Sequence, residues 1–291
     1  MRIVSLACSN TEIVCALGRA DFLVGVDDHS DYPEGVVASL PRVGPDLEID
    51  VDRVEALEPD LVLASLTVPG HEKVVEEVDA RGLPYIAPEP TSLPDVYENI
   101  RTIAELLGVP ERGRELAQEM RAVLGDGSRD AGEPREGPSI LVQWWPKPVI
   151  APGRRSWTTD VIERAGGRNP LGREPVKSRP MEDTEVHRLA PDAIILSWCG
   201  VDPAKYRPDV IYRNEEWQDL PALQEQRVFC VPEAYLGRPG PRLLDGYREI
   251  RRVIEAVEAG EPGEPRDPPG KRCDRAGSRA RSDTGKGTRG G

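Results

Sequence analysis

The feature that most constrains the fold is a pattern that occurs twice, once on each side of a helical stretch at residues 93–124. Residues 57–65 (LEPDLVLAS) return as residues 189–197 (LAPDAIILS), with leucine, proline, aspartate and serine in equivalent places. Each copy predicts a loop that leads into a buried strand. An offset of about 130 residues is far longer than a solenoid repeat, so we expect two related α/β lobes. The alternative is a chance similarity between two strand-entry loops.

Two shorter similarities support the same division. Residues 81–89 and 226–233 are both short apolar runs that end in Pro-Glu. A helical pattern in each half also ends in small residues and glycine, at 16–18 and at 165–167. Strand and helix patterns alternate, which favours mainly parallel sheets whose loops gather at the carboxyl ends of the strands.

The residues between the two copies have helical spacing. Val96, Ile100 and Leu107 lie on one apolar stripe, and a second stripe runs from Pro110 to Leu124. Proline is tolerated in the first turn of a helix, so a second helix is expected to begin at Pro110. At about 1.5 Å per residue this helix spans roughly 22 Å, which is enough to bridge two small lobes. We therefore expect a rigid helical connector.

The ends of these patterns set the expected domain boundaries. Residues 126–138 have no apolar stripe, which indicates a solvated linker. The tail from residue 260 has no periodicity and is expected to be disordered. The expected segments are an N-terminal α/β lobe at 1–92, a helical connector at 93–125, a linker with a C-terminal α/β lobe at 126–259, and the tail at 260–291.

The chain is strongly acidic. Its 291 residues carry a formal net charge of −13, and arginine outnumbers lysine 32 to 6. The tail from residue 260 is itself basic, so the folded part is more acidic than the whole chain. Nucleic acid is a poor partner for such a surface. The abundance of acids, the preference for arginine and the presence of only two phenylalanines resemble proteins from halophilic archaea. We expect a monomer.

Cysteine usage and hydropathy bear on the compartment. The five cysteines include no C-x-x-C pair, so neither a zinc site nor a disulfide framework is expected, and buried reduced thiols are the simpler interpretation. No apolar stretch reaches the 18 or so residues of a membrane span. The first strand is predicted to begin at Arg2, which leaves no room for a signal peptide and predicts a cytoplasmic protein. The alternative is a start that lies further upstream, with an export signal or lipid anchor before it.

Sequence motifs for catalysis are missing. The chain has no G-x-S-x-G, no Walker loop, no G-x-G-x-x-G after the first strand and no H-E-x-x-H. The three histidines, His29, His71 and His187, are far apart in sequence, and a solvated or structural role is the simpler interpretation for each. His29 and His71 nevertheless fall on loops between a strand and a helix, where parallel sheets present ligand-binding residues. We expect no catalysis and no bound cofactor or metal site.

Tryptophan placement is more informative. Trp144, Trp145 and Trp198 each follow a predicted strand of the second half, in a chain that is only 5% aromatic. A tryptophan buries roughly 150–250 Å², and a ring on an exposed loop loses the stabilisation from this burial unless something covers it. A large flat ligand would cover these rings. Packing between the lobes is the competing explanation, and it applies most to Trp157 and Trp217, which lie in helical patterns.

Several short motifs together resemble one known family. They are Ser9-Asn10-Thr11-Glu12, Asp31-Tyr32-Pro33, Leu40-Pro41-Arg42-Val43-Gly44, Leu57-Glu58-Pro59-Asp60 and Arg238-Pro239-Gly240-Pro241-Arg242. They are similar to the class III substrate-binding proteins of ABC importers, which bind cobalamin, iron-siderophores or haem. Trp144-Trp145-Pro146-Lys147-Pro148 and Ala165-Gly166-Gly167-Arg168-Asn169 are most similar to the cobalamin-binding branch. The resemblance covers about residues 1–259.

The resemblance implies two α/β lobes around a ligand crevice, joined by a rigid helical connector. It implies binding of cobalamin or a related corrinoid without catalysis, or of another metal chelate such as an iron-siderophore or haem. A cytosolic corrinoid carrier or sensor, uncoupled from transport, and an enzyme acting on a tetrapyrrole are the further alternatives. The ligand-contacting residues it suggests are His29, Tyr32, Thr67, Trp144, Trp145, Lys147, Trp198, Tyr235 and Arg238.

The family also docks on its ABC permease through one glutamate on each lobe. Glu72 fits the first position. The second position falls on Thr184, with Glu182 and Glu185 on either side as the candidates. The missing signal peptide and this threonine are the two departures from the family pattern.

Overall fold

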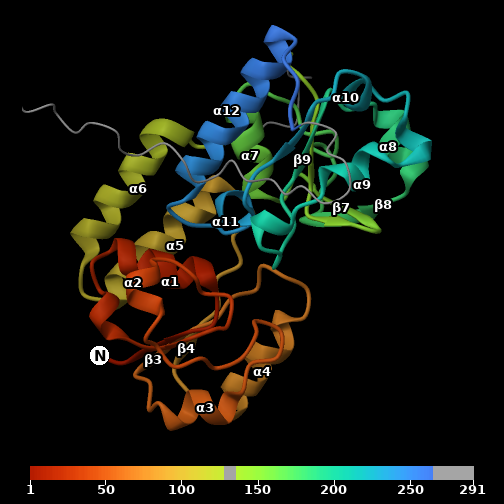
Figure 1. The fold of residues 1–291 in the computed structure, drawn as a ribbon. Helices are drawn as coiled ribbons and strands as arrows, with labels where there is room; N and C mark the ends of the chain where they lie inside the picture. The colour runs from red at the N-terminus through yellow and green to blue at the C-terminus, as the bar shows by residue number, and fades with distance from the viewer. Residues whose placement is uncertain (128–135, 265–291) are drawn as a thin grey trace, which may run out of the picture.

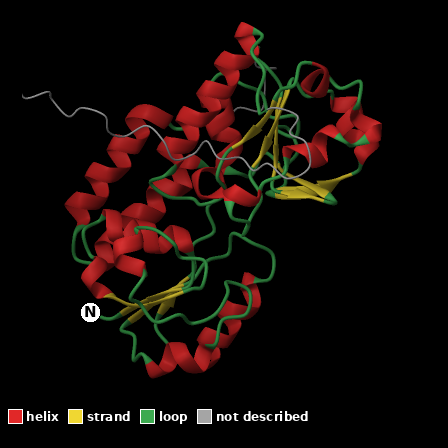
Figure 2. Ribbon diagram, in the orientation of Figure 1, coloured by secondary structure: helices red, strands yellow, loops and turns green. Residues whose placement is uncertain are grey.

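The computed structural model describes residues 1–127 and 136–264, which form two α/β lobes (Figure 1). The N-lobe, residues 1–92, has a four-stranded sheet in the order β2-β1-β3-β4, with every pair of strands parallel. Its elements are β1 (Ile3–Ser5), α1 (Cys8–Ala16), η1 (Ala20–Phe22), β2 (Leu23–Val26), α2 (Glu34–Val37), α3 (Val51–Ala56), β3 (Leu61–Leu63), α4 (His71–Ala80) and β4 (Tyr85–Ile86). Helices cover both faces of this sheet (Figure 2).

The C-lobe, residues 136–264, has a parallel sheet in the order β10-β9-β5 and a separate antiparallel sheet in the order β6-β7-β8. Its strands are β5 (Ile140–Gln143), β6 (Trp145–Pro146), β7 (Val149–Pro152), β8 (Ser178–Met181), β9 (Ala193–Leu196) and β10 (Val228–Cys230). Its helices are α7 (Trp157–Arg164), α8 (Asp183–Leu189), η2 (Pro203–Lys205), α9 (Pro208–Tyr212), η3 (Glu215–Trp217), α10 (Pro221–Gln224), α11 (Glu233–Leu236) and α12 (Leu243–Ala259). The predicted α/β class with mainly parallel central sheets is confirmed, and the antiparallel sheet is an addition.

The repeated sequence pattern corresponds to a repeated structure. In the N-lobe, the Asp60 carboxylate accepts the Arg2 N–H at 2.7 Å, and its own N–H donates to the Arg2 carbonyl at 2.8 Å. In the C-lobe, Asp192 makes the same pair of bonds to Ser139, also at 2.7 and 2.8 Å. Two residues before each aspartate, a non-glycine residue has a positive φ, 45° at Glu58 and 42° at Ala190. The aspartate therefore anchors the first strand of its lobe to the strand that follows the loop.

The connector has the two expected helices, and they form a hairpin. It consists of α5 (Leu93–Leu106) and α6 (Pro110–Leu124), which pack against each other. A Cβ at Gly113 would collide with the Cβ of Ala104, which shows how closely the two helices approach. Helix α5 links the lobes, because it contacts both α1 of the N-lobe and α7 of the C-lobe. The second helix also reaches both lobes: Arg112 in its first turn lies beside Gly18 of the N-lobe, and Val123 near its end accepts a hydrogen bond from Arg164 of α7 at 3.1 Å. Its apolar stripe packs back on α5 and on α12.

One hydrophobic core runs through both lobes. It joins one face of each parallel sheet to helices α1, α5, α6, α7 and α12. Two smaller cores lie on the opposite faces of the sheets, one in each lobe. A shared core resists separation of the lobes, because any large rotation would expose apolar area that folding has buried.

The tail begins later than expected. Within the described part of it, the N–H of Gly263 donates to Gln226 O at 2.8 Å and the N–H of Glu264 donates to Val228 O at 2.7 Å. Tyr212 donates its hydroxyl hydrogen to the carbonyl of Glu264 at 2.9 Å. Residues 260–264 are thus held along the open edge of β10, whose backbone groups need partners. The predicted boundary at residue 260 is wrong for these five residues; residues 265–291 and most of the predicted linker, 128–135, lie outside the described residues.

Over the two described ranges, no helix combines the length and the apolar character that crossing a bilayer requires.

Candidate ligand site between the lobes

A cavity of about 80 Å³ lies where the N-lobe meets the C-lobe. Its N-lobe wall follows the carboxyl ends of β1, β2 and β3, and its C-lobe wall is α11 with the turn after it. Ligands of parallel α/β sheets bind at this edge. The lining residues are Ala7, Cys8, Ser9, Asp27, Asp46, Thr67, Val68, His71, Glu233, Gly237, Arg238 and Pro239.

Asp27 is the buried carboxylate at the end of β2. It accepts hydrogen bonds from the Ser30 hydroxyl, from the His29 N–H at 3.0 Å and from the Cys8 thiol at 3.6 Å. Burial raises the pKa of Asp27, although these hydrogen bonds oppose the shift. Burial and the nearby Asp27 also raise the pKa of the Cys8 thiol. This part of the cavity is therefore short of positive charge.

Asp46 lies between two imidazoles. His29 Nε2 is 3.6 Å from one of its carboxylate oxygens, and His71 Nε2 is 3.5 Å from the other. The His71 side chain lowers the pKa of Asp46, against the opposing effect of burial. His71 is 5% exposed, and its Nε2 has no partner in hydrogen-bond geometry. Among the described residues, no three of the His, Cys, Asp and Glu side chains are arranged to hold a metal ion.

Arg238 joins the lobes on one side of the cavity. It donates to Asp31 at 2.5 Å and to Glu12 at 2.9 Å, both in the N-lobe, and to Glu233 in its own lobe at 3.4 Å. Burial raises the pKa of Glu12, and the charge of Arg238 opposes that shift. Burial alone would raise the pKa of Asp31 as well, but the hydrogen bond and charge of Arg238 lower it. These four residues are called the Arg238 cluster below.

Arg242 extends this contact with two aromatic rings. Its guanidinium lies 4.4 Å from the ring centroid of Tyr32 and 4.8 Å from that of Tyr235, and it donates to Glu12 at 3.3 Å. A second contact between the lobes comes from Lys177, which donates to Leu66 O at 2.9 Å and pairs with Glu89 at 2.7 Å. Side chains, rather than backbone, therefore bridge the crevice at two places.

The three tryptophans have different environments. Trp145 is 43% exposed on β6, beside the exposed Lys147 in the turn that follows. Trp144 is half-buried against the shared core, and its indole N–H has no hydrogen-bond partner. Trp198 is 7% exposed and donates its indole N–H to Gln143 at 3.0 Å. The expectation that all three stand on open loops is wrong for Trp198, because the C-lobe core buries its ring against Tyr206.

The structure brings some of the predicted ligand residues together and separates others. Thr67 and Arg238 line the cavity, and His29 and Tyr32 lie beside it through Asp46 and Arg242. The tryptophans do not line it. Ligand contact by these residues stays a prediction.

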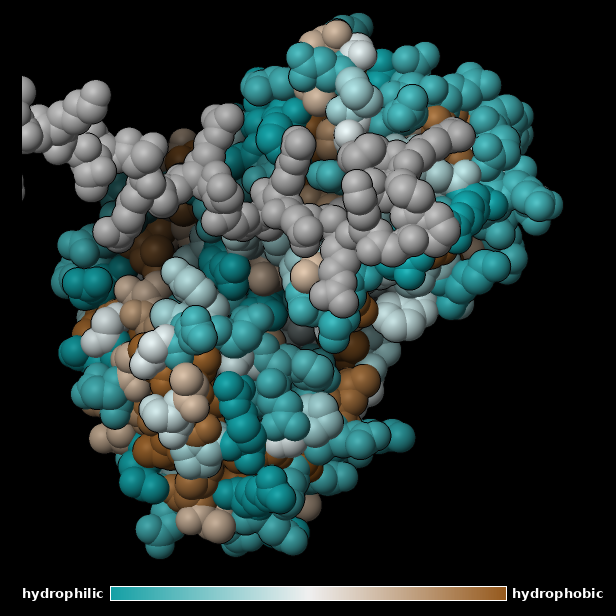
Figure 3. Space-filling model, viewed as in Figure 1, coloured by the Kyte–Doolittle hydropathy of each residue, from teal (hydrophilic) through white to brown (hydrophobic). Residues whose placement is uncertain are grey.

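Sequence reasoning missed two kinds of residue. Cys8, Asp27, Asp46 and Glu233 line the cavity but occur in ordinary polar loop sequences. Val68, which lines the cavity, is 40% exposed, and Leu47, next to the lining residue Asp46, is 46% exposed. The only signal available for any of them was their place after the carboxyl ends of strands. At the right of Figure 3 the surface is indented between the lobes, with hydrophobic residues on the N-lobe side of the indentation.

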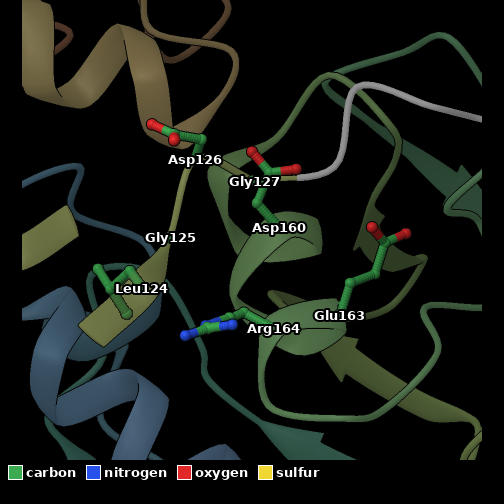
Figure 4. A pocket seen from close by; sticks show the side chains of 7 residues that line it. All are labelled: Leu124, Gly125, Asp126, Gly127, Asp160, Glu163 and Arg164. Carbon is green, nitrogen blue, oxygen red and sulfur yellow. The ribbon is translucent and has the colours of Figure 1, made fainter. Parts of the chain in front are cut away.

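A larger cavity, of about 130 Å³, lies elsewhere, between the end of α6 and α7 (Figure 4). Its buried carboxylate, Asp160, accepts the N–H of Leu93 at 2.9 Å and pairs with Arg154. Burial raises the pKa of Asp160 to about 6. These groups hold the start of α5 in place, so this cavity is part of the connector's support and not of the crevice.

The predicted docking residues lie at the starts of two helices. Glu72 is exposed in the first turn of α4 and accepts the N–H of Gly70 at 2.8 Å. Glu182 is exposed and precedes α8, whereas Glu185 is held in ion pairs with Arg179 at 2.6 Å and Arg188 at 3.6 Å. Figure 1 places α4 and α8 on the same side of the molecule, one on each lobe.

Comparison with known proteins decides the family. A family model described as periplasmic binding protein matches residues 3–235, which is most of the chain. The chain belongs to the periplasmic binding protein family. Members of this family bind their ligands without catalysis, and the expected absence of an enzymatic activity is consistent with this membership.

The chain is similar in sequence or in structure to several known proteins. An uncharacterized ABC transporter substrate-binding lipoprotein of Bacillus subtilis, YvrC, is 28% identical over 87% of this chain and 79% of its own length. A vitamin B12-binding protein of Vibrio campbellii is also 28% identical, over 87% of this chain and 89% of its own. Among solved structures, the periplasmic heme-binding protein RhuT of Roseiflexus superposes with a TM-score of 0.73 at 26% identity, covering 89% of this chain and 99% of that one.

Proposed function

We propose that this periplasmic binding protein is the substrate-binding component of an ABC importer and that it binds cobalamin or a related corrinoid between its lobes. The observation that carries the proposal is the crevice itself. N-lobe loops at the carboxyl ends of three parallel strands face α11 of the C-lobe across it, and apolar side chains are exposed beside it. The similarity to a vitamin B12-binding protein over most of both chains supports this ligand class.

The size of the cavity bears on how such a ligand enters. Sites for small molecules usually enclose about 300–1,000 Å³, well above the 80 Å³ present here. A macrocycle therefore needs the bridging side chains to rearrange. The contacts of Arg238 with Asp31 and of Lys177 with Glu89 are made by long side chains, so they can open while the shared core keeps the lobes together.

The charge of the crevice favours a corrinoid over haem. Asp27, Asp46 and Glu233 line the cavity, and its one guanidinium, Arg238, already contacts three carboxylates. The propionates of haem would meet like charges there, which costs affinity. A corrinoid whose edge carries amides avoids this repulsion. Haem remains the second candidate because the solved heme-binding protein shares the fold over most of the chain.

Binding is tested by titrating the purified protein with cyanocobalamin, dicyanocobinamide, haemin and a ferric hydroxamate while absorbance and heat are recorded. We expect saturable 1:1 binding of a corrinoid. Tyr32→Ala and Trp145→Ala should weaken it, whereas Val210→Ala, an equally exposed apolar residue on α9, should not. Binding of haemin alone would overturn the corrinoid assignment and leave the binding-protein assignment in place.

We also propose that Glu72 and Glu182 are the contacts with a permease. Both are exposed and each belongs to a different lobe, whereas the Glu185 carboxylate is held by Arg179. Charge reversal at Glu72 or Glu182 should abolish ligand-dependent stimulation of the transporter without changing ligand affinity. Charge reversal at Glu76, an exposed acid further along α4, is the matched control. Unchanged stimulation of the transporter in both docking variants would show that neither glutamate contacts the permease.

Importer function requires the protein outside the cytoplasmic membrane, whereas a corrinoid carrier or sensor uncoupled from transport would remain in the cytoplasm. Cell fractionation, together with mass spectrometry of the native amino terminus, separates the two locations.

A further inference from the structure

The cavity between the lobes contains a hydrogen-bond donor, His71 Nε2, whose nearest acceptor is the Asp46 carboxylate at 3.5 Å, outside hydrogen-bond geometry. Nδ1 of His71 accepts the N–H of Val68 at 3.4 Å, so the ring hydrogen lies on Nε2. His71 is one of the residues that line the cavity, and its Nε2 is shielded from bulk solvent and has no partner in hydrogen-bond geometry. A buried donor without a well-placed acceptor is costly, which makes it a group that a ligand can satisfy.

The same cavity has a surplus of acceptors. The carboxylates of Asp27, Asp46 and Glu233 face it, and its one guanidinium belongs to the Arg238 cluster. Burial raises the pKa values of both Asp27 and Glu233, against the opposing hydrogen bonds to Asp27 and the opposing charge of Arg238 beside Glu233. Asp46 is the most accessible of the three, with a third of its side chain exposed. Ligand N–H groups would therefore be favoured beside Asp46.

Three ligand groups can be compared against this arrangement. A carboxylate would accept from His71 but would be repelled by the three acids. An ammonium group would satisfy the acids but would leave His71 Nε2 with only the distant Asp46 carboxylate as an acceptor. A primary carboxamide has two N–H donors and one carbonyl acceptor, so it satisfies both kinds of group at once.

The volume agrees with one substituent of a ligand. About 80 Å³ is more than the roughly 30 Å³ that one water occupies in the liquid and far less than a macrocycle requires. We propose that this cavity is a subsite for a primary carboxamide side arm of the bound chelate, with Asp46 accepting the amide N–H and His71 Nε2 donating to the amide carbonyl. The proposal rests on ligand binding in the crevice, and it adds the chemical group that the crevice selects.

The test compares two ligands that share a macrocycle and differ in these groups. Dicyanocobinamide carries primary carboxamides, and dicyanocobyrinic acid carries carboxylates in their place. By titration of the full chain, the amide form should bind at least about tenfold more tightly, because like charges repel the acid form. In Asp46→Asn this preference should shrink towards unity, and in Glu48→Gln, an exposed neighbour on the same loop, it should be unchanged.

His71→Phe provides a second measurement. It removes the donor and fills the same space, so it should weaken binding of the amide form by about tenfold, which is the contribution of one buried hydrogen bond. Asp46→Asn should instead change mainly the affinity for the acid form. Melting curves of each variant establish that it is folded. Equal affinity for the two corrinoids in the unaltered protein would overturn the subsite, as would a preference that Asp46→Asn leaves intact.

A second pair of ligands, haemin and its bis-amide, compares the acid and amide forms on a macrocycle other than the corrin ring. If no corrinoid binds but the haem amide is preferred over haemin, the corrinoid assignment fails and the carboxamide subsite stands. If corrinoids bind without discrimination, the subsite fails and the function stands. If neither pair binds, both are wrong.

Discussion

The two lobes follow one plan up to the end of the strands and differ in what they build beyond it. Asp60 and Asp192 make the same two bonds to the first strand of their lobes. Beyond the strands, the N-lobe presents small titratable side chains such as Cys8, Asp27 and Asp46. The C-lobe presents an antiparallel sheet carrying Trp145, and α11 carrying Glu233. The difference shows that the repeated scaffold sets where a site is, while the loops divide polar recognition and aromatic cover between the two halves.

The largest expected effect separates the two tryptophans of the C-lobe. Trp198→Ala should lower the free energy of unfolding by about 3–5 kcal/mol, because it empties a buried ring position in the core. Trp145→Ala should change stability little and weaken ligand binding by about 1–3 kcal/mol. Denaturant unfolding and titration measure the two effects. A folded Trp198→Ala with reduced affinity would show that Trp198 faces the ligand after all.

The next effect concerns the contact between the lobes. Glu12→Ala should lower the free energy of unfolding by about 3 kcal/mol, near the lower end for breaking a buried ion pair, because Arg238 keeps Asp31 and Glu233. Lys177→Ala, at the more exposed contact with Glu89, should lower it by less than about 1 kcal/mol. Equal losses, measured by urea denaturation, would mean that both contacts support the lobes to the same degree.

The repeated aspartates give a smaller, matched comparison. Asp192→Ala leaves the N–H of Ser139 without its carboxylate in a partly buried setting and should cost about 1–3 kcal/mol. Asp60→Ala removes the same bond at the surface, where water replaces it, and should cost less than about 1 kcal/mol. Thermal melting of the two variants and of their double mutant measures this. A larger loss at Asp60 would contradict the role of burial.

The smallest effect is at the edge of the C-lobe sheet. Truncation after Ala259 removes the bonds that Gly263 and Glu264 make to the β10 edge and should cost about 1 kcal/mol. Hydrogen exchange should quicken in β10 and stay unchanged in β4, the corresponding strand of the N-lobe. Truncation after Glu264 is the control and should retain the full stability. No change in β10 after the shorter truncation would show that these residues add nothing.

Short-range patterns carried most of the fold prediction. The alternation of strands and helices, the two copies of the Leu-Pro-Asp-Ser loop and the start of a helix at Pro110 all depend on neighbouring residues, and the structure confirms them. Parts of the site were also predictable in this way, because Thr67 and His71 follow β3 and parallel strands present their carboxyl ends together. The family resemblance rests on the same local motifs.

The amino-acid sequence by itself therefore determined the α/β class, the two lobes, the helical character of the connector and the edge at which the site lies. Only the tertiary structure decided that α6 folds back on α5, that Trp198 is buried, that residues 260–264 cover β10, and that Asp46, His71 and Glu233 share one cavity. The physical reason is distance along the chain. Trp198 finds its hydrogen-bond partner 55 residues away, at Gln143. Periodicity records which face of an element is apolar, but it holds no information about which distant side chain covers that face.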